Sequence, residues 1–261
     1  MRQPPDHSLP DRDMDRPALI SALRARIARL DRSGGAAADG GQGIPLCESV
    51  DAALPGGGLS RAAVHEVLAA EPGAAAGFCA LVLARAGGTV LWIAPEPDAW
   101  PPGLARFGLS PADLVLVQAP RPVDGLWAME EALRCPGVAG ALLVLRSLDL
   151  TAARRLQLAA EAGGAVGLLL RPDEEEEAGG GASAALTRWR IGALAGTGGA
   201  AAHDLGDPRW SLDLLRCRGG RPANWRVVWR GAAERLERDE DATEADQPAR
   251  PVRAAATARR R

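Results

Sequence analysis

The sequence predicts an α/β protein whose mostly parallel sheet carries helices on both faces, with an antiparallel extension at its C-terminal end. Two patterns support this prediction. Between residues 64 and 172, short uninterrupted apolar segments alternate with longer segments in which apolar residues recur at helical spacing. After residue 185, polar and apolar residues alternate. The first pattern is typical of strands buried on both faces of a parallel sheet, and the second of half-exposed antiparallel strands.

The first pattern contains the expected strands and helices of the parallel part. The strands are the apolar segments "AVHEVLA", "TVLWIAP", "LVLVQ", "AGALLVLR" and "AVGLLLRP". Between the first two, we expect a Gly- and Ala-rich turn and a helix that ends at Arg85. The later helical segments are a turn in "PGLARFGL", a helix over residues 123–135 and a helix in "LTAARRLQLAAEAG". Each would return the chain to begin another parallel strand.

The second pattern follows the acidic, Gly-rich segment "DEEEEAGGGAS", which predicts a loop. The alternating segments are "LTRWRIGAL", "RWSLDLLRCR" and "WRVVWRG". In the last one, alternation places Trp225, Val227 and Trp229 on one face and Arg226, Val228 and Arg230 on the other. We therefore expect antiparallel strands that extend the sheet.

The two ends of the chain differ in composition from the expected core. Near the N-terminus an amphipathic helix is predicted, with an apolar stripe of Leu19, Leu23, Ile27 and Leu30. The stripe needs cover from its own domain, from a neighbouring copy or from a partner. The expected division is an arm with a Gly-rich linker (1–43), a core (44–231) and a charged, disordered tail (232–261).

Composition excludes one kind of chemistry. All 31 basic residues are Arg, so the chain supplies no Walker lysine, no Schiff base and no lysine general base. The formal net charge of −2 hides two acidic windows, Asp173–Glu177 and Glu234–Asp246, which leave the rest of the chain basic. A basic body is compatible with nucleic-acid contact and equally with a solvated arginine surface.

Nothing in the sequence predicts a cofactor or a metal site. The cysteines lie far apart, without a histidine cluster nearby, at Cys47, Cys79, Cys135 and Cys217. We expect them to be small buried hydrophobic residues of a protein in the reducing cytoplasm. The N-terminal residues contain no apolar signal-peptide region, and we expect no membrane contact.

Residues 64–95 have the order strand, turn, helix, strand in which a phosphate-binding loop would lie. The segment "IPLCESVDAALPGGGLSRAAVHEVLAAEPGAAAGFCALVLA" resembles the start of the RecA-like ATPase core, and the resemblance continues in order to about residue 230. It implies a RecA-like fold. It also places Glu96 near the catalytic glutamate of those ATPases and makes "VAGALLVLRSLDL" the counterpart of their Walker B strand.

The residues that carry ATPase chemistry are missing from both motifs. The degenerate phosphate loop consists of Glu71, Pro72, Gly73, Gly77, Phe78 and Cys79. Phe78 and Cys79 stand where a lysine and a hydroxyl are needed, and Arg146 replaces the magnesium-linked aspartate of the Walker B strand. Without a cationic clamp and a metal ligand we expect no ATP hydrolysis, although a helix start still attracts an anion weakly.

Several segments together resemble the ImuA family of bacterial mutagenesis factors: "LPGGGL", "HEVLA", "AGFCALVLARA" and "RCRGGRPANWRV", in a core without lysine. The resemblance implies a damage-inducible mutagenesis protein of the SOS response, and the missing ATPase residues predict that it is non-catalytic. Its implied partners are an ImuB-like protein related to Y-family polymerases and an error-prone replicative-type polymerase, in translesion synthesis. Two alternatives stay open, an active or nucleotide-regulated RecA-like ATPase and a cell-division inhibitor resembling SulA.

The C-terminal strands combine arginine and tryptophan, a pairing that suits single-stranded nucleic acid. The tryptophans have two interpretations, core packing or base stacking. For contact with DNA or a partner protein we expect the residues in and after "RCRGGRP", namely Arg216, Arg218, Arg221 and Arg226. Binding to DNA would be weak and non-specific. Self-association is a further expectation that the sequence leaves open.

Overall fold

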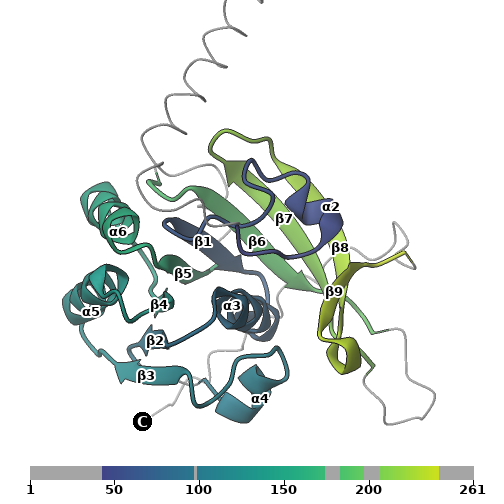
Figure 1. Ribbon diagram of the computed structural model, residues 1–261, viewed down its shortest axis with the longest axis horizontal. Helices are drawn as coiled ribbons and strands as arrows, with labels where there is room; N and C mark the ends of the chain where they lie inside the picture. The colour runs from purple at the N-terminus through teal and green to yellow at the C-terminus, as the bar shows by residue number, and fades with distance from the viewer. Residues whose placement is uncertain (1–42, 97–98, 174–182, 197–205, 241–261) are drawn as a thin grey trace, which may run out of the picture. The chain divides into compact units, whose positions relative to one another are not determined.

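The computed structural model describes residues 43–96, 99–173, 183–196 and 206–240. These residues contain a nine-stranded sheet in the order β3-β2-β4-β5-β1-β6-β7-β8-β9 (Figure 1). The strands are β1 (Val64–Ala69), β2 (Val90–Ala94), β3 (Leu114–Gln118), β4 (Gly140–Val144), β5 (Val166–Pro172), β6 (Thr187–Ala193), β7 (Arg209–Cys217), β8 (Ala223–Arg230) and β9 (Arg235–Arg238). The helices are α2 (Glu48–Asp51), α3 (Pro72–Ala86), α4 (Pro101–Ala105), α5 (Pro122–Arg134), α6 (Leu150–Gly163) and the 3-10 turn η2 (Gly231–Ala233).

The sheet has a parallel part and an antiparallel part. The strands from β3 to β6 in the sheet order are parallel to their neighbours, whereas β7, β8 and β9 join by antiparallel pairing. The sequence-based prediction of an antiparallel strand holds for β6 on the edge that pairs with β7, whereas its other edge pairs parallel with β1. This strand adds to the second edge of β1, with Trp189 opposite Val67. Local alternation does not encode that long-range pairing.

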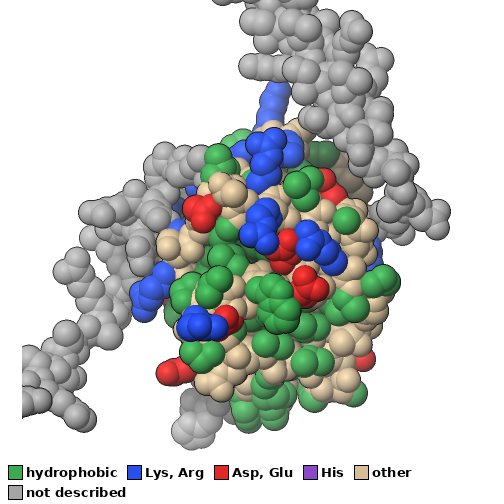
Figure 2. Space-filling model, turned by 90° about the vertical axis from the view of Figure 1, so that its left-hand side faces the viewer, with side chains coloured by type: hydrophobic (Ala, Val, Ile, Leu, Met, Phe, Trp, Pro, Cys, Tyr) green, Lys and Arg blue, Asp and Glu red, His purple; other side chains and the backbone are tan. Residues whose placement is uncertain are grey.

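Helices cover the parallel part on both faces, as the sequence predicts (Figure 1). α3 and α4 pack on one face, where Phe78 and Leu104 join the main core cluster. α5 and α6 pack on the other face, where Met129 and Leu156 contact the second cluster together with Leu169 of β5. The outer surface of the α5–α6 layer shows apolar side chains among arginines and acidic residues (Figure 2).

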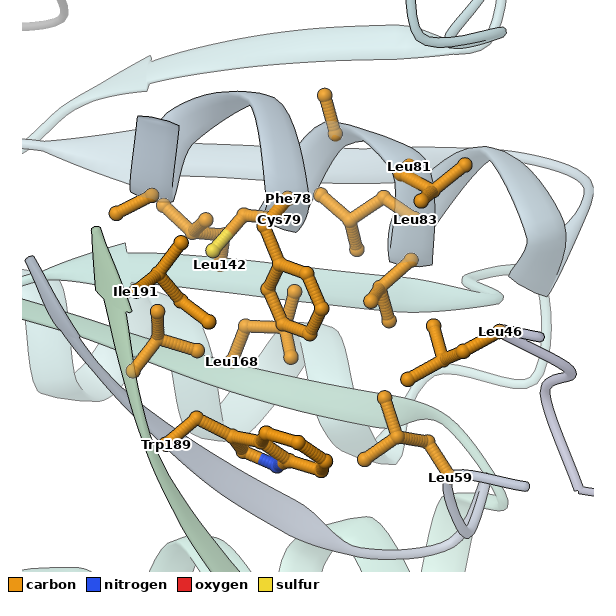
Figure 3. Close-up of a cluster of buried hydrophobic side chains, with 14 of the residues drawn as sticks. Leu46, Leu59, Phe78, Cys79, Leu81, Leu83, Leu142, Leu168, Trp189 and Ile191 are labelled. Carbon is orange, nitrogen blue, oxygen red and sulfur yellow. The ribbon is translucent and has the colours of Figure 1, made fainter. Parts of the chain in front are cut away.

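The main core cluster lies between α3 and the sheet (Figure 3). The ring centroids of Phe78 and Trp189 are 5.9 Å apart. The alternation predicted for the C-terminal strands is confirmed, because Val227 and Trp229 belong to this cluster and Trp225 packs against it. The tryptophans therefore extend one continuous core from the parallel part into the antiparallel part.

The chain before β1 closes one edge of this core. Ile44 and Leu59 form an antiparallel bridge with N–H to carbonyl distances of 2.7 and 2.9 Å, and both side chains are buried. The glycines of "LPGGGL" permit this approach, because a Cβ on Gly58 would lie 2.7 Å from the Ile44 carbonyl oxygen. Close backbone packing thus accounts for a glycine of this segment.

The expected boundary between core and tail at residue 232 is wrong. η2 and β9 continue the fold, and β9 pairs with β8 along its length. Leu236 of β9 is buried in the main cluster. A four-residue strand with one buried side chain leaves too short a pattern to be recognised inside a charged segment. Residues 1–42, which include the stripe of Leu19, Leu23, Ile27 and Leu30, lie outside the described residues, as do residues 241–261.

Two smaller expectations concern the cysteines and the membrane. Cys79 is buried as expected, but Cys135 is exposed, because it follows α5 in the turn that leads to β4. Among the helices of the described ranges, none is long and apolar enough to cross a membrane.

Candidate functional site at the start of helix α3

Helix α3 begins where the sequence predicts a Gly- and Ala-rich turn. Only Ala70 and Glu71 separate the end of β1 from Pro72, the first residue of the helix. Gly73 and Gly77 are therefore helical, and the prediction of a turn through them is wrong. Proline suits the first helical turn because the N–H that it lacks would have no intrahelical partner there. The residues that would form a phosphate loop are therefore part of the helix.

Glu71 fixes this junction to the neighbouring strand. Its backbone carbonyl accepts the N–H of Ala75 at 3.1 Å, and its Oε2 accepts the N–H of Ala193, at the end of β6, at 2.7 Å. Its Oε1 is buried without a hydrogen-bond partner among the described residues. The helix start therefore presents a carboxylate where a nucleotide phosphate would approach.

Phe78 and Cys79, which the sequence resemblance places at the positions of the Walker lysine and hydroxyl, point into the core rather than toward the helix start (Figure 3). Both are 0% exposed. Burial raises the pKa of the Cys79 thiol well above its usual range, so this side chain stays neutral. Neither residue has a charge or a hydroxyl with which to bind phosphate or magnesium.

Gly77 matches a glycine of the ATPase motif, and its role here is packing. A Cβ on Gly77 would lie 2.9 Å from Cζ of Phe107 and 3.0 Å from Cζ2 of Trp210. Both distances are closer than carbon atoms tolerate. The glycine therefore lets an aromatic layer lie directly against the second turn of α3.

The other predicted ATPase positions do not meet at this site. Arg146 follows β4 and is exposed, and its carbonyl accepts a hydrogen bond from Nε of Arg171 at 3.1 Å. Glu96 follows β2 and is also exposed. Neither lines the cavity beside α3. Arg146 lies two residues after the end of β4, and at the predicted Walker B position its side chain would bring a positive charge where magnesium needs a carboxylate.

A cleft of about 640 Å³ lies beside the start of α3, at the carboxyl ends of β1, β4 and β5. We call it the α3–α4 cleft. In open α/β sheets this edge is the usual place for ligands. Its wall is mostly apolar and includes Gly73, Ala76, Trp92, Trp100, Phe107 and Leu170.

The charged groups of the cleft wall are neutralised by their neighbours. Arg171 places Nη1 2.6 Å from Oε1 of Glu66, and Asp173 accepts from Nε of Arg190 at 2.7 Å. Both are therefore committed to ion pairs. The cleft suits an uncharged, apolar group far better than a triphosphate.

Glu66 is the centre of a buried ion network on the α5–α6 side of the sheet. It accepts from Nη1 of Arg171 at 2.6 Å and from Nε of Arg188 at 2.7 Å. Burial alone would raise the pKa of Glu66, but the hydrogen bonds and charges of Arg188 and Arg171 outweigh it and lower that pKa. Arg188 is thus part of the sheet interior and is not a surface for DNA.

His65, one residue earlier on β1, lies on the opposite face in a chain of hydrogen bonds. The indole N–H of Trp189 donates to Thr187 Oγ1 at 2.7 Å, which lies 2.7 Å from Nδ1 of His65, and Nε2 lies 2.9 Å from the Ser60 carbonyl. A carbonyl only accepts, so Nε2 carries the proton and Nδ1 accepts from the threonine hydroxyl. Burial lowers the pKa of His65 to about 4. The histidine is a neutral core residue.

The predicted arginine contact forms a separate feature, the β7–β8 hairpin. Arg216, Arg218 and Arg221 are exposed near its turn, and Arg226 is half-buried on β8. Arg216 donates through Nη1 to the carbonyl of Ser183 at 2.5 Å. The structure therefore places the first three predicted arginines at or beside one turn. This turn follows Cys217, which pairs with Thr187 at the start of β6, so it lies at the opposite end of the strands from the α3–α4 cleft.

The aromatic wall of the cleft is the feature that sequence analysis missed. Trp92, Trp100 and Phe107 come from β2, from the segment before α4 and from the segment after it. Trp100 is 69% exposed and precedes the two prolines that begin α4, which is the only local signal of a fixed aromatic side chain. Their convergence depends on tertiary packing that no local pattern expresses.

A comparison with solved structures identifies the fold class of this protein. A solved structure of the RadB recombinase matches with a TM-score of 0.56, covering 74% of this chain and 97% of that chain at 13% identity. At that identity the match shows the fold alone, and it confirms the predicted RecA-like core. No protein-family model matches the chain.

Two curated relatives then give the family. Both are called Protein ImuA, come from two strains of Caulobacter vibrioides and are 41% identical over 192 residues, covering 68% of this chain and 79% of each relative. The chain belongs to the ImuA family.

Proposed function

We propose that this chain is a non-catalytic interaction protein of SOS-type mutagenic DNA repair, acting in the cytoplasm in translesion synthesis. Its membership of the ImuA family supports the setting. One observation carries the non-catalytic role: a helix replaces the phosphate loop, and the residues at the lysine and hydroxyl positions, Phe78 and Cys79, are core residues. A rigid RecA-like sheet without this chemistry still presents surfaces for partners.

The proposed partner is an ImuB-like protein related to Y-family polymerases, together with an error-prone replicative-type polymerase. The core offers an apolar surface for such contact on α5, α6 and the edge strand β3 (Figure 2). Its large side chains are 45–65% exposed and include Val115, Val123, Trp127, Leu150 and Leu158. Large exposed patches of apolar residues often mark the sites where proteins bind one another.

The predicted N-terminal helix is the second contact of this proposal. Its stripe of Leu19, Leu23, Ile27 and Leu30 suits a hydrophobic groove, and the Gly-rich linker gives it reach. Changing Leu23 and Ile27 to Asp should reduce capture of a purified ImuB-family partner at least tenfold in a pull-down or calorimetric titration. The melting temperature of the α/β core should stay within about 2 °C, since surface changes are usually neutral.

A matched control separates the stripe from added charge. Ser21→Asp with Ala25→Asp places the same charges, at the same spacing, on the opposite face of the predicted helix, and it should bind like the wild type. If the Leu23 and Ile27 variant loses several degrees of melting temperature and still captures the partner, the helix belongs to its own core.

A weak DNA contact is a second candidate, favoured by the exposed arginines of the β7–β8 hairpin. Nucleotide regulation finds less support, because the α3–α4 cleft has paired charges and the nearby Glu71 carboxylate opposes a phosphate. The DNA contact and the loss of ATPase chemistry are each given a test below.

A further inference from the structure

The two end strands of the sheet differ in how their open edges are protected. β9 has the sequence RLER, and Nη2 of its Arg235 lies 2.6 Å from Oε1 of Glu237. β3, at the other end of the sheet order, has the sequence LVLVQ, without a charge or a proline. Charged side chains on an edge strand discourage pairing with another chain, whereas an uncharged edge is a template for it. Of the two ends of the described sheet, β3 is therefore the one that suits a further strand.

The side chains of β3 are accessible on both faces of the sheet. Val115 is 45% exposed and Leu116 is 41% exposed, and the strand lies at the end of the sheet (Figure 1). Leu114 packs against the main core cluster and Val117 against the second one. The leucines therefore lie on the α3 side and the valines on the α5 side. A strand added to this edge would cover apolar surface on both faces.

The backbone of β3 alternates between β2 and the open edge. The carbonyl of Asp113 accepts the N–H of Val90 at 2.8 Å, and the N–H of Ala119 donates to the carbonyl of Ala94 at 2.9 Å. The residues with odd numbers therefore bond to β2, and those with even numbers direct their backbone groups to the open edge. The outward-facing residues of the strand are Leu114, Leu116 and Gln118.

This edge is complementary to itself. If two copies pair antiparallel about a twofold axis at Leu116, Leu116 faces Leu116 of the second copy, and Leu114 faces Gln118 of the second copy. Because all of these residues face outward, each pair can exchange both of its N–H to carbonyl bonds. The Leu114 N–H would give up a long contact, 3.4 Å to the carbonyl of Pro111. A shift of the axis along the strand leaves one of its ends unpaired.

The charges that flank β3 favour the same antiparallel orientation. Asp113 precedes the strand and Arg121 follows it, and both are exposed, although Arg121 also pairs with Asp124 at 2.6 Å. Antiparallel pairing brings the acidic end of one strand toward the basic end of the other, and it places Asp113 opposite the uncharged Ala119. Like charges directly opposite one another would be destabilising, and this register contains none.

We infer that the open edge of β3 pairs with β3 of a second copy of this chain, antiparallel about a twofold axis at Leu116. The two sheets then form one continuous sheet. Such an interface uses the same strand of both copies and closes, so the product is a dimer. The inference goes beyond the proposed function. It assigns the β3 edge to self-association and leaves the apolar side chains of α5 and α6 for the partner.

Leu116→Lys tests the position of the axis, because it places two like charges directly opposite each other. Sedimentation velocity of the purified full chain, from micromolar to hundreds of micromolar concentration, should show a monomer–dimer equilibrium for the wild type. The dissociation constant of the dimer should rise at least tenfold in the variant. Leu158→Lys, on α6 and 58% exposed, is the matched control and should dimerise like the wild type. Both substitutions are at exposed positions and should change the melting temperature of the monomer little.

A mixture of two variants tests the register. Leu116 faces itself only when the axis passes through it, so mixing Leu116→Lys with Leu116→Glu should restore a dimer that neither variant forms well alone. Mixing could not rescue a variant that had merely misfolded. The variant with Leu23 and Ile27 changed to Asp should dimerise like the wild type, which separates the β3 edge from the N-terminal stripe.

The contrary outcomes are distinct. A wild type that stays monomeric, that forms species larger than a dimer, or whose dimer survives Leu116→Lys would overturn the inference, as would a mixture that restores nothing. Loss of the dimer in the Leu23 and Ile27 variant would assign self-association to the arm instead. If the wild type is monomeric and Leu116→Lys abolishes capture of a purified ImuB-family partner, the edge belongs to that partner. Sedimentation needs no partner, so its result leaves the proposed function untouched.

Discussion

The start of α3 and the β7–β8 hairpin are the two places where the sequence predicts contact with a ligand, and they differ in how their side chains are used. At the start of α3 the residues of the former motif face inward, and the charges of the adjoining cleft are paired. At the hairpin, Arg216, Arg218 and Arg221 are exposed at or beside the turn. The first region therefore depends on shape and apolar contact, whereas the second offers charge.

This difference shows how packing alone can stabilise a RecA-like core. The βα order is maintained by packing, because Phe78 meets Trp189 and Gly77 admits Phe107. A lysine at position 78 would have to be removed from that core to reach a phosphate. The hairpin arginines are not held in a core, because the close packing of the turn against Pro55 involves its glycines.

Restoring the ATPase motif residues in α3 is the most direct test of the difference between the two regions. Changing Phe78 to Lys and Cys79 to Thr recreates the motif residues, but it removes a buried ring and places an ammonium among Trp189 and Trp210. We expect a loss of at least about 4 kcal/mol in the free energy of unfolding. Urea denaturation measures this loss, and a coupled assay should find no magnesium-dependent ATP turnover in either protein.

Phe78→Met is the control, because it keeps the side chain apolar and should cost about 1–2 kcal/mol. A double variant that is as stable as the wild type and hydrolyses ATP would mean that the helix can reopen into a loop. Turnover by the wild type itself, at rates above background with single-stranded DNA, would equally contradict the non-catalytic proposal.

The polar interior of the sheet gives a second, smaller effect, on pH dependence. The pKa of His65 is about 4 in the folded protein and 6.5 in its unperturbed state, so between these values the unfolded chain binds a proton that the folded chain does not. The stabilisation is complete above pH 6.5 and is lost as pH falls toward 4. It amounts to about 3 kcal/mol.

His65→Gln provides the reference, since Gln keeps a donor and an acceptor and does not titrate. The difference in unfolding free energy between wild type and variant, measured in urea at pH 7 and pH 4.5, should shift by about 2–3 kcal/mol against the wild type. Equal shifts in both proteins would show that His65 titrates normally and that its hydrogen-bond chain opens readily.

The fold was accessible to sequence analysis where its signals are local. The apolar segments and amphipathic helices define the parallel part, and α6 matches its predicted segment from Leu150 to Gly163. The missing lysine is equally visible. The start of the helix at Pro72 could not be predicted from the sequence. Two glycines favour a turn locally, whereas packing against Phe107 and Trp210 stabilises the helix.

Long-range pairing limits the rest of the prediction. β6 is parallel because its partner is β1, more than a hundred residues earlier, with His65 opposite Thr187. β9 is too short to leave a pattern. The cleft depends on Trp92, Trp100 and Phe107, which converge only in the folded chain. The sequence therefore shows which motif residues are missing, but the apolar cleft could be found only in the structure.

Substitutions in the hairpin should have the smallest effect on stability. Their main effect should be on the salt dependence of DNA binding. Replacing Arg216, Arg218 and Arg221 with Ala should change the free energy of unfolding by about 0.5 kcal/mol or less, because these side chains are exposed. If each arginine neutralises one phosphate, the log–log salt slope for single-stranded DNA should fall by about 0.7 per arginine, or about 2 for all three. Fluorescence anisotropy of a labelled oligonucleotide between 20 and 200 mM salt, about the range in which such slopes are resolved, measures it.

Removing three exposed arginines elsewhere controls for net charge. Arg106, Arg146 and Arg154 are exposed and lie outside the hairpin, so their replacement by Ala should lower affinity only through the general field and leave the slope nearly unchanged. Equal slopes for the two triple variants would mean that DNA responds to overall charge and not to the hairpin. The arginines of the β7–β8 hairpin would then remain candidates for contact with a protein partner.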